Sequence, residues 1–201
     1  MTTLLLIRHG HTAMVGNRLA GRSPGIHLSS QGEGEAAELV KSLSEVRIDA
    51  VFSSPLERTR ETAQRISEAS GKPVQVVENL VEIDYGEWTG RRIESLREDP
   101  VWIRYNRFRS TTRIPGGEWF VEVQDRVVKA LEELRTQHAE QILAIVTHGD
   151  VIRVAISHYI AIPLDMITRL VVKPASVSAL SLSDHAPELL FTNFRGATLS
   201  L

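Results

Sequence analysis

Two short apolar runs, one near each end of the chain, finish in the same pair of residues. The run at 4–7 leads through Arg8 to His9, the run at 142–147 leads to His148, and a glycine follows each histidine. Apolar runs of this length are typical of strands buried on both faces of a sheet. Ligands of open α/β sheets bind beyond the carboxyl ends of such strands, so the polar residues there are candidate binding residues.

Strand-like segments alternate with helical ones along the rest of the chain. Strands are predicted at 3–8, 49–53, 74–77, 142–147, 175–183 and 188–193, and helices at 31–45, 55–70, 118–138 and 151–160. This alternation predicts βαβ units and an α/β fold of three layers, α/β/α, around a mostly parallel central sheet. The last two strands follow each other closely, which favours an antiparallel hairpin at one edge.

The length of 201 residues predicts one domain, 1–201, with a cap-like excursion at about 86–117. That segment is rich in arginine and aromatic residues. The simplest interpretation of its arginines is a solvated helical cap. A second interpretation is a lid whose arginines meet an acidic group of a substrate. A third, nucleic-acid binding, is disfavoured because the formal net charge of the chain is -2.

Composition excludes several other classes. The chain has no cysteine, so neither disulfides nor thiolate chemistry contribute. Its apolar runs are too short for a membrane span, and the first strand begins without a signal peptide. We therefore expect a cytoplasmic protein without nucleic-acid or membrane partners. The apolar strand at 188–193 makes a homodimer possible.

Two further motifs belong at the same edge of the sheet. Arg58 follows the strand at 49–53 and lies in the first turn of the next helix, where backbone amides favour an anion. Glu82 opens an acidic loop in which Asp84 and Glu87 are rival acids. If the strands that end at the two histidines are neighbours, histidines and arginines surround one pocket. Such a ring of donors suits a dianionic phosphoryl group.

At this point the chain resembles the histidine phosphatase superfamily, whose fold is that of phosphoglycerate mutase. The matching motifs are Arg8 to Thr12, Ser54 to Arg58 with Thr62-Ala63 following, Glu82 to Gly90, Pro115 to Glu118 and Thr147 to Gly149. They stand in the family's order and span nearly the whole chain. Departures are His11, Thr89 and Trp119, where the family usually has Glu or Gln, Glu and Ser; these changes concern substrate recognition more than chemistry.

The resemblance implies a role for each site residue. His9 is the expected nucleophile, and forms a phosphohistidine. Arg8, Arg58 and His148 bind the phosphoryl oxygens, and Glu82 protonates the leaving oxygen. Two further residues, Asn17 and Gly149, are candidate substrate-binding residues.

The implied activity is a metal-independent phosphomonoester phosphatase acting on a small phosphorylated metabolite, without a cofactor. A cofactor-dependent phosphoglycerate mutase is the first alternative, and a non-catalytic phosphate-binding or regulatory protein is the second. His9 and His11 form a His-x-His pair that could ligate a metal. We do not favour a metal site, because no Asp or Cys cluster accompanies the pair.

Overall fold

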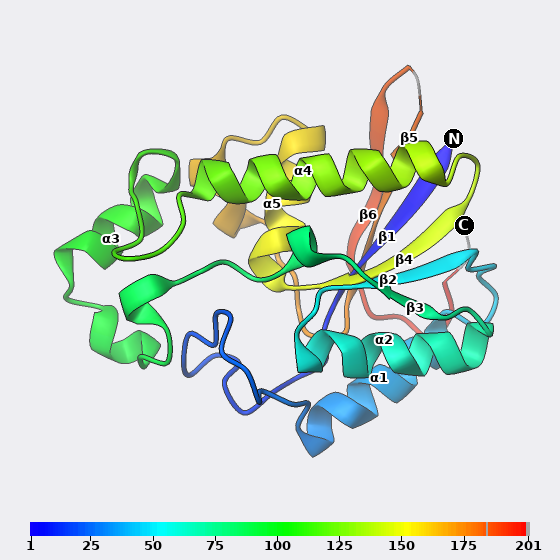
Figure 1. Ribbon diagram of the computed structural model, residues 1–201, viewed down its shortest axis with the longest axis horizontal. Helices are drawn as coiled ribbons and strands as arrows, with labels where there is room; N and C mark the ends of the chain where they lie inside the picture. The colour runs from blue at the N-terminus through cyan, green and yellow to red at the C-terminus, as the bar shows by residue number, and fades with distance from the viewer. Residues whose placement is uncertain (184, 200–201) are drawn as a thin grey trace.

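The computed structural model describes residues 1–183 and 185–199, and Figure 1 shows a sheet with helices on both sides. The strands are β1 (Thr2–Arg8), β2 (Ala50–Ser53), β3 (Val74–Val76), β4 (Ile142–Thr147), β5 (Val177–Leu182) and β6 (Pro187–Phe194). The α-helices are α1 (Ser30–Ser42), α2 (Glu57–Ser70), α3 (Pro100–Arg107), α4 (Phe120–Gln137) and α5 (Gly149–Tyr159). The predicted α/β class is confirmed.

The six strands are ordered β3-β2-β4-β1-β5-β6. β3, β2, β4 and β1 pair in parallel, whereas β5 runs antiparallel to β1 and β6 antiparallel to β5. The mostly parallel sheet and its terminal hairpin are therefore as predicted; Asp184, in the predicted hairpin turn, lies outside the described residues. The two strands that end in His-Gly are direct neighbours, with Arg8 opposite Thr147.

The alternation of side chains along β1 divides the core into two layers. Leu4 and Leu6 belong to the apolar cluster that α4 and α5 cover, and Leu5 and Ile7 belong to the cluster that α1 and α2 cover. All four are 0–1% exposed. Figure 1 shows these two pairs of helices on opposite sides of the sheet, which is the expected three-layer arrangement.

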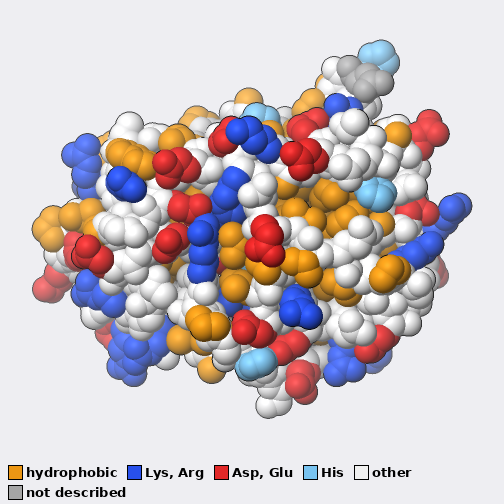
Figure 2. All heavy atoms as spheres, viewed as in Figure 1, with side chains coloured by type: hydrophobic (Ala, Val, Ile, Leu, Met, Phe, Trp, Pro, Cys, Tyr) orange, Lys and Arg blue, Asp and Glu red, His pale blue; other side chains and the backbone are white. Residues whose placement is uncertain are grey.

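The segment 86–117 leaves the sheet and carries α3, at the left of Figure 1. Two of its aromatic side chains, Trp88 and Tyr105, are 1% exposed and join the main apolar cluster, whereas Phe108 is 52% exposed. Most of its arginines are exposed: Arg91, Arg92, Arg97, Arg104, Arg107 and Arg113. Figure 2 shows basic and acidic side chains interspersed over this region. The solvated interpretation is wrong for Arg109, which is 5% exposed with its guanidinium 4.6 Å above the Tyr105 ring.

Three predicted helix starts need correction. The helix predicted at 118–138 begins two residues later, at Phe120, with Trp119 as its N-cap residue. The sequence places Pro55 at the start of a helix, but Leu56 is still extended, with φ -75° and ψ 146°, and α2 begins at Glu57. Arg58 keeps its predicted place in the first turn. α5 begins at Gly149, two residues before the predicted position, with His148 as its N-cap residue. Because the helix begins directly after the strand, its first amides point toward the site.

Among the described residues, none of the helices combines the length and the apolar character that a membrane span requires.

The first turn of α1 holds the loop that follows β1. The His11 amide donates to Glu35 Oε2 (2.8 Å), and the His11 carbonyl accepts from the Ser29 amide (2.9 Å). The backbones approach so closely that both facing residues are glycine. A Cβ on Gly32 would lie 2.1 Å from the His11 oxygen, and a Cβ on Gly10 would lie 2.6 Å from the Gly32 oxygen. The glycines thus let α1 support the loop that carries His9.

We predict that Gly32→Ala lowers the free energy of unfolding by at least about 1–3 kcal/mol, because the new methyl group overlaps backbone that cannot move aside. Gly34→Ala is the matched control on the same helix, since its Cβ would meet open space. It should raise stability by about 0.5–1 kcal/mol through helix propensity. Urea unfolding measures both variants. Equal effects of the two substitutions would contradict the packing argument.

Candidate active site

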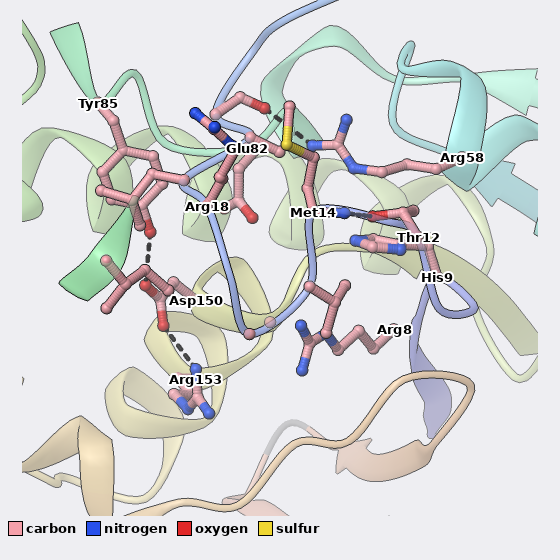
Figure 3. A pocket seen from close by; sticks show the side chains of 17 residues that line it. Arg8, His9, Thr12, Met14, Arg18, Arg58, Glu82, Tyr85, Asp150 and Arg153 are labelled. Atoms are coloured by element: carbon pink, nitrogen blue, oxygen red, sulfur yellow. Dashed lines mark hydrogen bonds and ion pairs between the residues drawn. The ribbon is translucent and has the colours of Figure 1, made fainter. Parts of the chain in front are cut away.

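A cavity of about 150 Å³ opens where β1 and β4 end (Figure 3). Its lining includes most of the predicted site residues: Arg8, His9, Arg58, Glu82 and Gly149. His148, which lies directly behind His9, is not part of that lining, and neither is the predicted binding residue Asn17. The Asn17 side chain is exposed, and its backbone carbonyl accepts a hydrogen bond from the Ile93 amide (2.9 Å). Neighbouring Val15 and Gly16 face the cavity instead, so the structure gives Asn17 no contact with the site.

His9 is 4% exposed, and its Nδ1 lies 2.7 Å from the Gly10 carbonyl oxygen. A carbonyl oxygen only accepts, so Nδ1 carries the proton of the neutral ring and Nε2 carries the lone pair. Burial lowers the pKa of His9 well below its usual value, and Arg58 and Arg8 lower it further. The imidazole is therefore neutral at physiological pH, with Nε2 in its nucleophilic form.

His148 is fully buried, and its ring centroid lies 5.3 Å from that of His9. Its Nε2 is 2.8 Å from Ser54 Oγ. Its Nδ1 lies 3.8 Å from Glu82 Oε2. Burial, followed by the charge of Arg58, lowers the pKa of His148 well below its usual value, so the Glu82 contact is not an ion pair. A Ser54 hydroxyl that donates to Nε2 leaves Nδ1–H as an unused donor on the side of Glu82.

The arginines present unused donors to the same space. Arg8 donates through Nη1 to the Val172 carbonyl (2.7 Å), and Arg58 donates through Nη2 to the Gly21 carbonyl (2.8 Å). Arg8 Nε, Arg58 Nε and Nη1, and His148 Nδ1 are buried and have no hydrogen-bond partner among residues 1–183 and 185–199. Buried donors left unpaired cost about 1–3 kcal/mol each, so their convergence indicates an anion site.

Glu82 is the acid that faces this site. Its side chain is 13% exposed, and Oε1 accepts from the Ile83 amide (3.0 Å). Burial raises its pKa to about 7, and the charge of Asp150 adds to the effect while Arg58 opposes it. The rival acids are placed elsewhere: neither Asp84 nor Glu87 lines the cavity, and Asp84 Oδ1 accepts from the Gly86 amide (2.9 Å).

Gly149 has a steric reason to be glycine. A Cβ at this position would lie 3.3 Å from Nε and Cζ of Arg8 and 3.6 Å from Nη1 of Arg153. The absence of a side chain lets the Arg8 guanidinium lie against the start of α5. Arg8 thereby reaches the cavity beside the helix N-terminus, where a positive end of the dipole favours the same anion.

The structure adds several residues to the site for which the sequence predicts no role. Ser54 orients His148, and Thr62 Oγ1 accepts from the Gly10 amide (3.1 Å), which anchors the loop after β1. Both lie in the segment Ser54 to Ala63, which carries part of the family resemblance. Tyr85 and Asp150 also line the cavity, and their side chains are joined by a 2.9 Å hydrogen bond. Tyr85 lies in the motif Glu82 to Gly90 and Asp150 directly follows the motif Thr147 to Gly149, but neither motif indicates their contact.

The His-x-His pair is not placed as a metal site. Nδ1 of His11 lies 3.0 Å from Ser29 Oγ. Within residues 1–183 and 185–199, no group of three or more His, Asp or Glu side chains is arranged to hold a metal ion. The donors that converge on the cavity are cationic or neutral N–H groups, which suit an anion.

Comparison with known proteins shows the family to which the chain belongs. A family model, the histidine phosphatase superfamily (branch 1), matches residues 4–195. The chain belongs to the histidine phosphatase superfamily. Phosphoserine phosphatase 1 of Hydrogenobacter thermophilus is 33% identical over 153 residues, 74% of this chain and 71% of that protein. A probable phosphoglycerate mutase of Escherichia coli is 31% identical over 180 residues, 89% of this chain and 84% of that protein.

A solved structure extends the likeness to the whole fold. The mycobacterial glucosyl-3-phosphoglycerate phosphatase, described as a complex with VO3, is 27% identical and has a TM-score of 0.87. The alignment covers 95% of this chain and 98% of that one. The proteins that resemble this chain thus include phosphatases and a probable mutase.

We predict that Arg58→Met weakens binding of inorganic phosphate by about 10- to 100-fold, since charge-assisted hydrogen bonds contribute about 1.5–3 kcal/mol. The free energy of unfolding should stay the same or rise, because an incompletely paired buried charge is removed. Arg60→Met, exposed on the same helix, is the control and should bind phosphate like the parent protein. Isothermal titration calorimetry distinguishes these outcomes, and equal phosphate affinity of the two variants would contradict the assignment.

Proposed function

We propose that the protein is a metal-independent phosphomonoester phosphatase that forms a phosphohistidine at His9. The observation that carries the proposal is the convergence of unpaired buried donors on the cavity beside Nε2 of His9. A phosphoryl group at this point satisfies Arg8, Arg58 and His148 together. The arginines supply the positive charge that a metal ion supplies in other phosphatases.

The first step is an in-line displacement at phosphorus. The Nε2 lone pair of His9 forms the N–P bond while the ester P–O bond breaks, and Glu82 gives its proton to the departing oxygen. The Nδ1–H bond to Gly10 stabilises the imidazolium character that develops on the ring. Arg8, Arg58 and the Nδ1–H of His148 bind the non-bridging oxygens, on which charge is spread in the transition state.

The second step transfers the phosphoryl group to water. Water forms a new P–O bond while the N–P bond breaks, and the electron pair returns to His9 Nε2. Glu82, now ionised, takes the proton of the water. A pKa of about 7 suits this double use, because the carboxyl group must donate in one step and accept in the next near neutral pH.

The small cavity supports a small substrate. Its volume of about 150 Å³ lies below the range of about 300–1,000 Å³ that is usual for drug-sized ligands. The phosphoserine phosphatase among the relatives supports a phosphatase acting on a compact metabolite. The second candidate is a phosphoglycerate mutase, which the probable mutase of Escherichia coli favours. Release of free phosphate without a bisphosphoglycerate primer, undiminished by chelator, supports the phosphatase; phosphoryl return to the substrate supports the mutase.

We predict that His9→Ala abolishes the phosphoprotein and lowers kcat by at least about 10³-fold, as removal of a catalytic nucleophile does. A ³²P-labelled ester and an alkaline quench measure the trapped phosphohistidine. His158→Ala, at an exposed position on α5, is the control and should label like the parent protein. Labelling that survives in His9→Ala would sink the nucleophile assignment. Absence of hydrolysis across a broad panel of phosphate esters would leave the non-catalytic alternative.

We predict that Glu82→Gln slows alkyl phosphates by about 10²–10⁴-fold but p-nitrophenyl phosphate much less, because a good leaving group needs no proton. Glu82 is protonated below a pH of about 7 and loses its proton above it, so kcat/KM for alkyl esters should fall as the pH rises through that value. The variant should lack this fall. Equal losses on both ester types, or an unchanged pH profile, would show that another group is the acid.

A further inference from the structure

The wall of the cavity away from His9 carries charges that phosphoryl transfer does not use. Tyr85, Asp150 and Arg153 lie on one side of the space in Figure 3, His9, Arg8 and Arg58 lie on the other, and Glu82 stands between them. Asp150 is the centre of this wall. Its Oδ2 accepts from the Tyr85 hydroxyl (2.9 Å), and its Oδ1 accepts from Arg153 Nη1 (2.6 Å).

A carboxylate is an unusual lining for a cavity that binds a dianion. The side chain of Asp150 is 18% exposed, and the charges of Arg153 and Arg109 outweigh its burial, so that its pKa is lowered and it stays ionised. Each oxygen of a carboxylate has room for two hydrogen bonds, and each oxygen of Asp150 accepts one within the described residues. The unused acceptor positions of the Asp150 carboxylate repel a second phosphate or a carboxylate of a ligand and attract a cationic hydrogen-bond donor.

Arg153 places a positive charge directly beside that carboxylate. Its Nε donates to the Leu170 carbonyl (2.9 Å) and its Nη1 to Asp150, which uses two of its five N–H donors within the described residues. The side chain is 23% exposed and lines the cavity. A cation and an anion, held 2.6 Å apart on one wall, match a ligand that carries the opposite charges on neighbouring atoms.

This wall lies close to the phosphoryl site. Arg8 and Arg153 both lie against Gly149, since a Cβ at that position would be 3.3 Å from Arg8 Nε and 3.6 Å from Arg153 Nη1. A leaving group that reaches both ends is therefore short. Only a few atoms separate its ester oxygen from its charged groups.

We propose that Asp150 and Arg153 form a leaving-group subsite for a small zwitterion, in which Asp150 binds an ammonium group and Arg153 a carboxylate. The substrate class is the phosphate ester of a short hydroxylated amino acid. This inference rests on the proposed phosphatase activity, and it adds the discrimination between leaving groups. A purely structural role, in which the pair only joins α5 to Tyr85, gives no such discrimination.

Three probes of similar size test the subsite: the phosphate ester of serine, the analogue with hydrogen in place of the ammonium group, and 2-aminoethyl phosphate, which lacks the carboxylate. For the parent protein, kcat/KM for the serine ester should exceed that for each analogue by at least about tenfold. Asp150→Asn should bring the ratio of serine ester to desamino ester close to one. Arg153→Met should do the same for the ratio of serine ester to 2-aminoethyl phosphate.

Ratios within one variant separate recognition from catalysis. Loss of the Asp150 charge also lowers the pKa of Glu82, but this change acts on all three alkyl esters alike and cancels in the ratio. Asp125→Asn, exposed on α4, is the control and should keep the parent ratios. Thermal unfolding of each variant checks that it is folded.

Two results overturn the subsite while leaving the phosphatase intact. One is equal kcat/KM for the serine ester and the desamino ester in the parent protein. The other is a parent-like ratio in Asp150→Asn, with p-nitrophenyl phosphate still hydrolysed through labelled His9. Failure of the proposed function gives a different pattern, because then no ester, p-nitrophenyl phosphate included, is hydrolysed and His9 is not labelled. That pattern overturns the subsite as well.

Discussion

The geometry of the site depends on the backbone hydrogen bonds between β1 and β4. Their parallel register sets Arg8 opposite Thr147, so the residues that follow, His9 and His148, leave the sheet side by side. The ring centroids are 5.3 Å apart although the two residues are far apart in sequence. A shift of one residue in this register would turn the apolar side chains of β1 to the wrong faces. The core that fixes the register thus also fixes the positions of His9 and His148, the proposed catalytic pair.

The sheet provides the position, and burial provides the chemistry. Burial lowers the pKa of His9 and raises that of Glu82 to about 7, so the same dry surroundings keep the proposed nucleophile neutral and let the proposed acid titrate near neutral pH. The unpaired donors of Arg8 and Arg58 are the cost of this arrangement. A folded chain retains such groups where a bound ligand completes their hydrogen bonds, as is common for sites that trade stability for function.

The sequence predicts more of the fold than of the site. Leu4 to Ile7 point alternately to two cores, a pattern that a buried strand dictates, and the two His-Gly pairs predict their own proximity. Helix starts were less accurate, because the extended backbone at Leu56 depends on tertiary contacts around Ser54. Asn17 was a candidate only through the family resemblance, and the structure leaves it outside the cavity that Val15 and Gly16 line.

The partnership of Tyr85 with Asp150, and of Asp150 with Arg153, illustrates what only three-dimensional structure reveals. Tyr85 and Asp150 are distant in sequence, and Asp150 and Arg153 look like an ordinary pair on one turn of a helix. Their importance comes from the cavity they face. The buried Arg109 is similar: an arginine among exposed arginines, distinguished only by its stacking on Tyr105.

The central claim is that the phosphoryl group passes through His9 on its way to water. The stereochemistry at phosphorus tests this most directly, with a phosphate ester made chiral by ¹⁶O, ¹⁷O and sulfur and hydrolysed in H₂¹⁸O. Two in-line displacements, at His9 and then at water, predict overall retention of configuration. Inversion would show a single direct attack by water and would contradict the account.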